Sequence, residues 1–468
     1  MAEYSPMMQH YLQTKEEYKD CILFYRLGDF YEMFFDDAIT TSRELELTLT
    51  GKDCGQEERA PMCGIPFHAA ETYIARLIEK GYKVAICEQV EDPKQAKGIV
   101  KRDVIRVVTP GTVMESNLLE EKKNNYIMAI YKNGIYYGVA VCDLTTGDFK
   151  STQIKEQNNF ATLMDEISRF SPAEIVVNLI LYESSSEISK IRERFGVYIS
   201  KLEDENFELE TQIFENTYEV LDENEQKVSN IEEKLFCVAA SNGLLNYLRQ
   251  TQKNNLDYIH KIHIYETTHY MNLDISARRN LEITEKLRDK SKKGTLLWVL
   301  DKTSTSMGGR LLRRWLNDPL IDVFKINERL EAVKELKEDL ILRGDVIDSL
   351  KKVYDIERLA GKISYGSANA RDLISLKNSV KQLPDVKKTL EKANAPLLKQ
   401  LYEELDVLED IYEIIDTSII DDPPISVKEG GLIKLGYNEE IDHLKKATTD
   451  GKSWVLEIEA KEREKTRN

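Results

Sequence analysis

The sequence has no hydrophobic run long enough to cross a membrane, because no stretch approaches the roughly 18 apolar residues that a spanning helix needs. Its first twenty residues also lack the basic segment followed by an apolar segment that forms a secretion signal. These two absences favour a cytoplasmic protein without a membrane partner.

Cysteine is scarce, and the six cysteines are scattered: Cys21, Cys54, Cys63, Cys87, Cys142 and Cys237. None has the C-x-x-C spacing that is typical of zinc sites, and the pattern indicates no disulfide framework. We therefore expect reduced thiols, most of them buried.

A phosphate-binding loop is also missing from the sequence. Gly451-Lys452-Ser453 resembles the end of such a loop, but the motif requires a glycine five residues earlier, where this chain has Lys446. We therefore expect no cofactor in this chain and no ATPase activity from it.

Positive charge is in short supply, since 82 acidic residues outnumber 65 basic ones and the net charge is -17. This balance argues against a nucleic-acid partner, because affinity for DNA comes largely from Lys and Arg on phosphates. The segment 94–106 is an exception, with one acid, Asp103, and five basic residues: Lys94, Lys97, Lys101, Arg102 and Arg106. A basic DNA-binding patch and a solvated strand edge both explain this segment.

Residues 1 to about 110 have the pattern of a small mixed α/β domain. The apolar run CILFYRL, 21–27, ends at Gly28-Asp29, which predicts a buried strand followed by a turn. The segment 71–90 predicts a helix that ends at Gly81 and then a strand.

A second α/β module is predicted from about residue 124. Two β-rich runs are joined by Asn133-Gly134, a strong hairpin signal. A helical pattern at 160–170 and a strand pattern at 173–179 follow. This order of elements is typical of an RNase H-like or related module.

The acids of this second module raise the alternative of a nuclease. Asp143 and Asp148 are candidate metal ligands, but a two-metal site needs several carboxylates around ions ~4 Å apart. The next strand supplies only Glu174. A structural or partner-docking role is therefore favoured over a nuclease.

From about residue 232 the pattern becomes almost wholly helical, with apolar residues at three- and four-residue spacing. Residues 437–468 predict a charged pair of amphipathic helices. His260, His263 and His269 lie close together in the sequence, but no matching carboxylate or cysteine motif follows. Interior or capping histidines are favoured over metal ligands.

The stretch FYEMFF, 30–35, contains four aromatic residues beside the predicted turn. If it begins a helix, Phe30, Met33 and Phe34 share one face, and burial of all four aromatic rings is favoured. The alternative is an exposed ring at the turn, because Phe wedges between base steps are a known means of kinking DNA.

Seven motifs occur in the order in which they occur in one protein family, and they span residues 24–442: FYRLGDFYEMFFDDA, APMCGIPFHA, VAICEQVEDP, IRVVTPGT, RRNLEIT, SMGGRLLRRWLNDPL and EGGLIKLGYNEEID. Together they resemble the bacterial MutS family of DNA mismatch-repair proteins. Because the motif with FYE is present, the chain resembles the branch that binds mismatches.

The resemblance implies a multidomain fold with the following residues: a mixed α/β mismatch-recognition domain, 1–112; a linker, 113–123; an RNase H-like connector, 124–258; an all-α lever or core domain, 259–430; and the start of a clamp, 431–468. The ATPase domain of the family, with its ATP and Mg, would follow. The chain thus resembles the N-terminal half of such a protein, cut inside the clamp.

The resemblance also implies which side chains bind DNA. Phe30 resembles the wedge that stacks on a mismatched base, and Glu32 resembles the acid that hydrogen-bonds that base. Lys52 and Arg102 match basic positions of the first domain. The expected function is recognition of mismatched or unpaired bases in double-stranded DNA, which initiates mismatch repair near the nucleoid.

The expected partners are mismatched DNA, a MutL-like repair protein and a second copy of the chain. The alternative is an interaction scaffold or inactive fragment that docks a repair partner through the connector. Comparing a heteroduplex with its perfectly paired homoduplex separates the two hypotheses.

Overall fold

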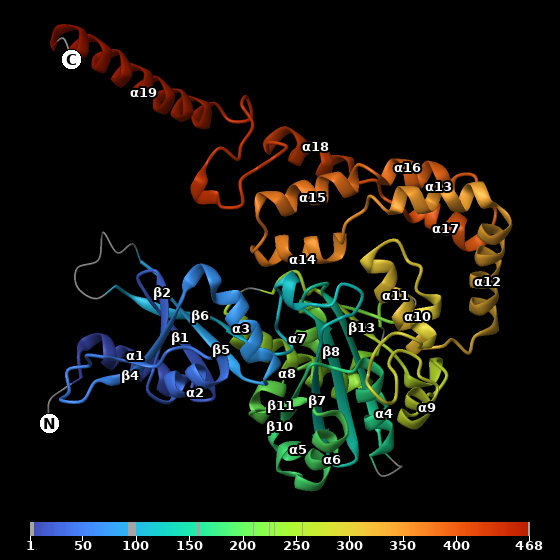
Figure 1. Ribbon diagram of the computed structural model, residues 1–468. Coiled ribbons are helices and arrows are strands. Elements are labelled where there is room, and N and C mark those ends of the chain that lie inside the picture. The colour runs from blue at the N-terminus through green and yellow to red at the C-terminus, as the bar shows by residue number, and fades with distance from the viewer. Residues whose placement is uncertain are drawn as a thin grey trace. The chain divides into compact units, whose positions relative to one another are not determined.

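A computed structural model describes residues 4–91, 100–156, 160–208, 210–223, 225–228, 230–254 and 256–466 (Figure 1). The chain divides into two compact units. The first comprises Met1–Val323 and Ala360–Tyr365, and the second comprises Phe324–Leu359 and Gly366–Asn468.

The first module of unit one is a six-stranded sheet with three helices. Its strands lie in the order β3-β4-β2-β1-β5-β6. The elements are α1 (Pro6–Glu17), β1 (Cys21–Leu27), β2 (Phe30–Phe34), α2 (Phe35–Leu45), β3 (Thr50–Lys52), β4 (Ala60–Pro66), α3 (Ala70–Glu79), β5 (Lys83–Gln89) and β6 (Arg102–Val108). β1 pairs parallel with β5, and the other neighbours pair antiparallel. The predicted turn at Gly28, helix before Gly81 and following strand are confirmed.

Helices cover both faces of this sheet, so apolar residues on both sides of β1 and β2 are buried. Tyr11 of α1 packs edge-on against Phe34, with ring centroids 4.9 Å apart. On the opposite face, Leu45 of α2 and Leu77 of α3 join Tyr31 in one apolar cluster. The ring of Tyr31 is therefore fixed from behind by two helices.

The second module is a seven-stranded sheet in the order β11-β10-β7-β8-β9-β13-β12. Its strands are β7 (Tyr126–Asn133), β8 (Tyr136–Asp143), β9 (Asp148–Lys155), β10 (Glu174–Asn178), β11 (Tyr198–Leu202), β12 (Glu219–Leu221) and β13 (Lys261–Ile264). The predicted hairpin is confirmed: Asn133 pairs with Tyr136, and Gly134 has a φ of 61° that glycine adopts without strain.

Helices also cover both faces of the second sheet (Figure 1). They are α4 (Ala161–Phe170), α5 (Leu179–Glu183), α6 (Ser185–Phe195), α7 (Thr211–Thr217) and α8 (Leu235–Gln252). α4 and α6 pack on the face with Met128 and Ile130, and α8 packs on the face with Ala129 and Ala140. The helix and strand predicted at 160–170 and 173–179 are confirmed.

The close approach of α8 to β8 depends on a glycine. A Cβ atom at Gly138 would lie only 1.8 Å from the carbonyl oxygen of Phe236.

β13 is an exception to the helical pattern after residue 232, because Lys261–Ile264 pairs parallel with β9 and β12 inside this sheet.

The acids of the second module serve structural contacts. Asp143 is fully buried and accepts hydrogen bonds from the backbone and hydroxyl of Thr145 at 2.9 and 2.7 Å. Asp148 accepts from Lys150 at 2.8 Å and from the Tyr126 hydroxyl at 2.9 Å. Burial would raise the pKa of Asp148, but the charges of Lys150 and Arg314 outweigh it and lower the pKa to about 2.

Acid is expected to remove the contribution of Asp148 to stability. Its folded pKa lies below the value of ~3.9 in an unfolded chain, so the stabilisation is complete above about pH 4 and disappears as the pH falls toward 2. At neutral pH the Asp148→Asn variant should lose about 2 kcal/mol. Thermal melts of the wild-type chain and of Asp148→Asn should show a difference in melting temperature that becomes smaller from pH 7 to pH 3. A difference that stays constant over this range would contradict the role of the Asp148 charge.

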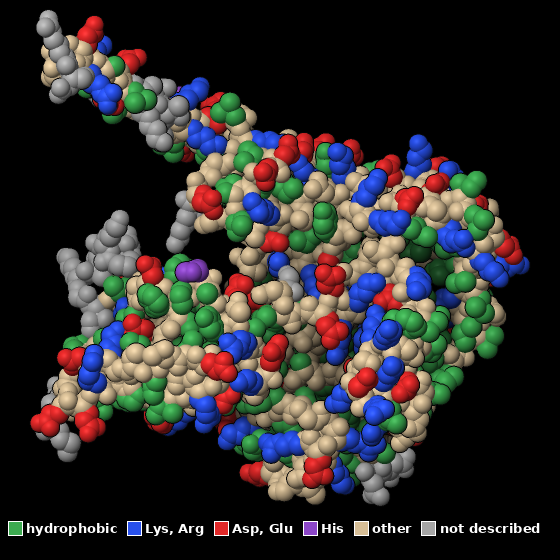
Figure 2. Space-filling model, in the orientation of Figure 1, with side chains coloured by type: hydrophobic (Ala, Val, Ile, Leu, Met, Phe, Trp, Pro, Cys, Tyr) green, Lys and Arg blue, Asp and Glu red, His purple; other side chains and the backbone are tan. Residues whose placement is uncertain are grey.

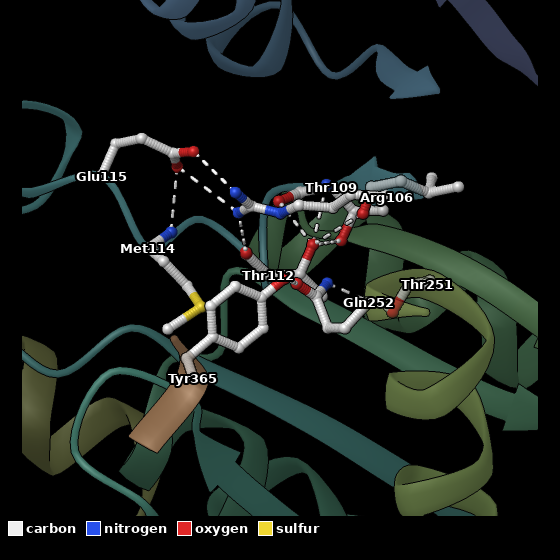
Figure 3. Close-up of polar contacts among 9 residues, drawn as sticks. Arg106, Thr109, Thr112, Met114, Glu115, Thr251, Gln252 and Tyr365 are labelled. Atoms are coloured by element: carbon white, nitrogen blue, oxygen red, sulfur yellow. Dashed lines mark hydrogen bonds and ion pairs between the residues drawn. The ribbon is translucent and has the colours of Figure 1, made fainter. Parts of the chain in front are cut away.

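A polar junction joins the segment after β6 to the second module (Figure 3). Arg106 donates to Glu115 at 2.7 Å and to the Thr112 carbonyl at 3.0 Å. The Tyr365 hydroxyl donates to Gln252 of α8 at 3.2 Å. The Arg106 guanidinium lies over the Tyr365 ring, 6.0 Å from its centre, so residues from three distant parts of the sequence meet within unit one.

The rest of unit one contains three short helices: α9 (Ile275–Asn280), α10 (Leu296–Leu300) and α11 (Ser306–Asn317). Unit two contains α12 (Val323–Glu338), α13 (Leu340–Leu350), α15 (Ala370–Val380), α16 (Leu383–Leu390), α17 (Pro396–Glu404), α18 (Glu409–Ser418) and α19 (Glu439–Thr466), and α14 (Ile356–Tyr365) is divided between the units. A core around Leu342, Val386 and Leu398 supports unit two. The helix pair predicted at 437–468 is wrong, because α19 is one continuous helix of 28 residues.

All six cysteines are buried free thiols, as expected. In the part of the chain that the structure describes, no helix combines the length and the apolar character that a membrane crossing requires.

Candidate nucleic-acid interface

The stretch after the Gly28-Asp29 turn is a strand, and the interpretation of FYEMFF as the start of a helix is wrong. Phe30–Phe34 forms β2, which pairs with β1 on one side and β4 on the other. Successive side chains of a strand point to opposite faces. Phe30 and Glu32 therefore share one face, and Tyr31 points to the other.

Phe30 is exposed, so the expectation that all four aromatic rings are buried is also wrong. Its side chain lies at the first position of β2 and is 48% exposed, whereas Tyr31 and Phe34 are buried and Phe35 is half-buried. α1 covers this face of the strand at Phe34, four residues further on. The ring at the start of the strand is left open to solvent.

Glu32 and Lys52, both of which the sequence resemblance assigns to DNA binding, form an ion pair with each other. The Lys52 ammonium lies 2.5 Å from a Glu32 carboxylate oxygen. The pair crosses β4, which separates β2 from β3. Gly64 of β4 lies opposite Glu32, and a Cβ at Gly64 would make an ordinary van der Waals contact with the Glu32 side chain at 3.5 Å.

Behind the turn lies a support that the sequence reasoning missed. The guanidinium of Arg26 stacks 3.7 Å from the centre of the Phe67 ring and pairs with Glu88 at 3.2 Å. The Phe67 backbone donates to the Asp29 carbonyl at 3.0 Å. The Tyr31 hydroxyl also donates to Glu88, and burial together with this bond raises the pKa of Tyr31 above its usual value. The motif letters include Arg26 and Phe67, but they do not show that these residues stack.

Arg102 is not brought to the exposed group. It is 8% exposed, and its guanidinium donates to the carbonyls of Arg26 and Val100 at 2.7 Å each. It also lies over the Tyr25 ring. Through the Arg26 carbonyl, Arg102 holds the strand that leads into the turn.

The basic segment 94–106 does not form one exposed patch over its described residues. Arg102 is buried and Arg106 pairs with Glu115, which leaves Lys101 exposed. The interpretation of this segment as a patch is corrected accordingly. Lys94 and Lys97 lie outside the described residues.

The three histidines lie at the edge of the second module. His260 and His269 are exposed and His263 is half-buried, so of the two expected roles, interior or capping, the interior role is wrong for the first two. His263 and His269 lie near Glu225 and Glu223, respectively. Over the described ranges, no three His, Cys, Asp or Glu side chains form a cluster suited to a metal ion.

This group of residues has the chemistry of a binding surface. It presents one rigid, exposed aromatic ring, one carboxylate on the same face of the strand, and a lysine that neutralises this carboxylate. An aromatic ring of this kind stacks on a base or inserts between bases with little entropy to lose, since few torsions need to be fixed.

Comparison with known proteins identifies the family of the chain. Three family models match in succession: MutS domain I at residues 5–117, MutS domain II at 125–260 and MutS domain III at 276–466. The first match contains all six strands of the first sheet, and the second contains six of the seven strands of the second sheet, since β13 follows its end.

Curated relatives match along the whole chain. The DNA mismatch repair protein MutS of Acetivibrio thermocellus is 58% identical over 474 residues, and that of Ruminiclostridium cellulolyticum is 56% identical over 467 residues. Each alignment covers 100% of this chain and 53% of the relative. The MutS of Alkaliphilus oremlandii is 50% identical with the same coverage. The chain therefore spans about half the length of these relatives, and it belongs to the MutS family.

Proposed function

We propose that this chain recognises mismatched or unpaired bases in double-stranded DNA and so initiates mismatch repair. Phe30 inserts as a wedge at the faulty step, and Glu32 forms a hydrogen bond with the displaced base. The observation that carries the proposal is the exposure of Phe30 at the start of β2, on the same face as Glu32.

Discrimination comes from the DNA itself. A mismatched step is poorly paired, so unstacking and kinking it costs less than the same deformation of a matched step. A matched step resists opening, so the ring gains its stacking energy mainly at the mismatched step. The difference in deformation energy therefore becomes a difference in binding energy.

The pair between Glu32 and Lys52 limits the cost of placing a carboxylate beside phosphates. Alone, the carboxylate would be repelled by the DNA backbone. With the ammonium of Lys52 at 2.5 Å, the repulsion is largely cancelled and the carboxylate stays oriented. Lys52 also contributes to the affinity for phosphates, and Arg102 supports the strand before the turn.

Binding of a G·T heteroduplex and of its homoduplex, compared at one fixed salt concentration, tests the proposal. The chain should bind the heteroduplex more tightly. Equal binding of both duplexes would favour the alternative, a scaffold that docks a repair partner without reading DNA.

Removal of the Glu32 charge is expected to weaken discrimination. Glu32→Gln should bind the homoduplex roughly fivefold more tightly, because the Lys52 ammonium is then no longer neutralised and attracts the phosphates by about 1 kcal/mol more. The heteroduplex should gain less, because it loses the contact with the carboxylate. Fluorescence anisotropy with both duplexes measures the ratio of the two dissociation constants. Glu79→Gln is the matched control, since the exposed Glu79 at the end of α3 carries the same charge away from β2; if both variants behave alike, Glu32 has no specific role.

Further features are proposed from family likeness. The second module is the RNase H-like connector and binds a MutL-like protein, the helical region is the lever with the beginning of the clamp, and two copies of the whole protein form a dimer that uses ATP. The strand order β11-β10-β7-β8-β9, with β8 antiparallel to its neighbours, supports the first assignment. Pull-down of a MutL-like protein by this chain tests the docking role.

A further inference from the structure

A basic cavity lies in unit one, away from β2. It has a volume of about 380 Å³ and is formed by residues of α4, α9 and α11 and by the segment 283–290. Figure 2 shows Lys and Arg side chains over the part of the molecule that carries α9 and α11. The volume falls within the range of small-molecule sites, which is about 300 to 1,000 Å³.

Ten of the side chains that line the cavity are Lys or Arg, and two are acids, Glu285 and Asp318. This excess of positive charge occurs in a chain with a net charge of -17. One of the acids is already paired, since Asp318 accepts from Arg169 at 2.7 Å. Acids outside the lining pair with two more of the basic groups, since Arg314 lies 3.9 Å from Asp148 and Lys123 lies 4.0 Å from Glu120. Basic side chains nevertheless outnumber acidic ones in the lining.

For two arginines of the lining, the cost of burial outweighs the attraction of nearby acids. The Nε atom of Arg313 is buried and has no hydrogen-bond partner in the described part of the chain. Arg278 donates to the carbonyls of Leu273 at 2.9 Å and Asn317 at 2.7 Å, which hold the guanidinium without cancelling its charge. Burial lowers the pKa of both arginines below the usual value. An anion in the cavity would relieve this cost.

The lining also includes an apolar part. Phe170, Ile275, Ile283 and Leu287 line the cavity beside the basic groups. A ligand with a charged end and an apolar or aromatic end would satisfy both parts. Arginine is suited to phosphate because its planar group donates two parallel hydrogen bonds.

We propose that this cavity binds a small molecule that carries two or more phosphate groups. One phosphate would leave most of the guanidinium groups without an anion, whereas a di- or triphosphate meets several at once. A DNA duplex cannot enter a cavity of this size, although its phosphates could touch the rim. The proposal is independent of the proposed reading of mismatches, because it involves neither Phe30 nor Glu32.

Isothermal titration calorimetry of the 468-residue chain with inorganic triphosphate and with ATP tests the proposal. The sequence contains no phosphate-binding loop, so such binding has no competing site of that kind. Binding should be detectable at sub-millimolar concentration in physiological salt. Arg313→Gln and the exposed Arg279→Gln should each weaken it at least tenfold. Arg288 lies in the segment 283–290 but does not itself line the cavity, so Arg288→Gln should change the affinity less than twofold.

A circular-dichroism melt checks that each variant folds. If Arg313→Gln does not fold, Arg279→Gln still tests the site. Tighter binding of ATP than of triphosphate identifies a nucleotide, and equal binding identifies a free polyphosphate. Both results support the site. Absence of binding, equal losses in all three variants, or displacement of triphosphate by homoduplex DNA would overturn the proposal.

Discussion

Replacing Phe30 by alanine is expected to remove most of the preference for a mismatched duplex. Stacking of an aromatic ring on a base contributes ~1 to 3 kcal/mol, so affinity for a G·T heteroduplex should fall roughly 5- to 150-fold. The homoduplex should lose little, because a matched stack resists the wedge and is held through its phosphates. The two dissociation constants should therefore converge.

The control for this variant is Ile105→Ala. Ile105 is a large apolar side chain of the same sheet and is 46% exposed, similar to Phe30, but it lies on β6 and not on β2. Its removal should leave both affinities unchanged. If Phe30→Ala weakens both duplexes equally, the ring contributes general affinity and does not read the mismatch.

A methyl group at position 138 is expected to loosen the second module. The Cβ of Gly138→Ala would overlap the Phe236 carbonyl, 1.8 Å away, and the backbone of α8 cannot yield as a flexible side chain could. Overpacking of this kind costs about 3 kcal/mol. Amide exchange in β8 and α8 should accelerate roughly a hundredfold.

Hydrogen exchange with peptide resolution is the suitable measurement, because a chain with several domains does not unfold in a single two-state step. Gly344→Ala serves as the control, since a Cβ at this position in α13 meets no atom within 4 Å. Protection of β8 and α8 should be unchanged in the control. If Gly138→Ala has the same pattern as the control, the two backbones are not in the close contact described.

Local signals in the sequence were sufficient for several elements. Asn133-Gly134 predicts the hairpin because few residue pairs tolerate the tight turn. The apolar run before Gly28 predicts β1, and Gly81 marks the end of α3, because glycine adopts a positive φ there. In each case the deciding interaction lies within a few residues of the signal.

β2 could not be predicted from its own letters. Both faces of the first sheet are covered by helices, so Met33 and Phe34 are both buried and the alternation that marks a strand is lost. Read as a strand, the same letters place Phe30 and Glu32 on one face. The covering by α1, which stops short of Phe30, is a tertiary feature that local periodicity does not contain.

Long-range pairing explains the other differences. Arg102 and Arg106 form part of a basic run in the sequence, yet they find partners at Arg26 and Glu115 and turn inward. Glu32 and Lys52 are joined across an intervening strand. The order of charges along the sequence therefore does not predict which charged side chains are exposed, because the fold determines the partner of each.

The central claim is that the Phe30 ring enters the base stack at a mismatch. A duplex with 2-aminopurine beside a G·T pair tests it most directly, since the fluorescence of this base rises when it is unstacked. Addition of the chain should raise the fluorescence of the mismatched duplex, and Phe30→Ala should abolish the rise at concentrations that saturate binding. An equal rise with the wild-type chain and with Phe30→Ala would contradict the account.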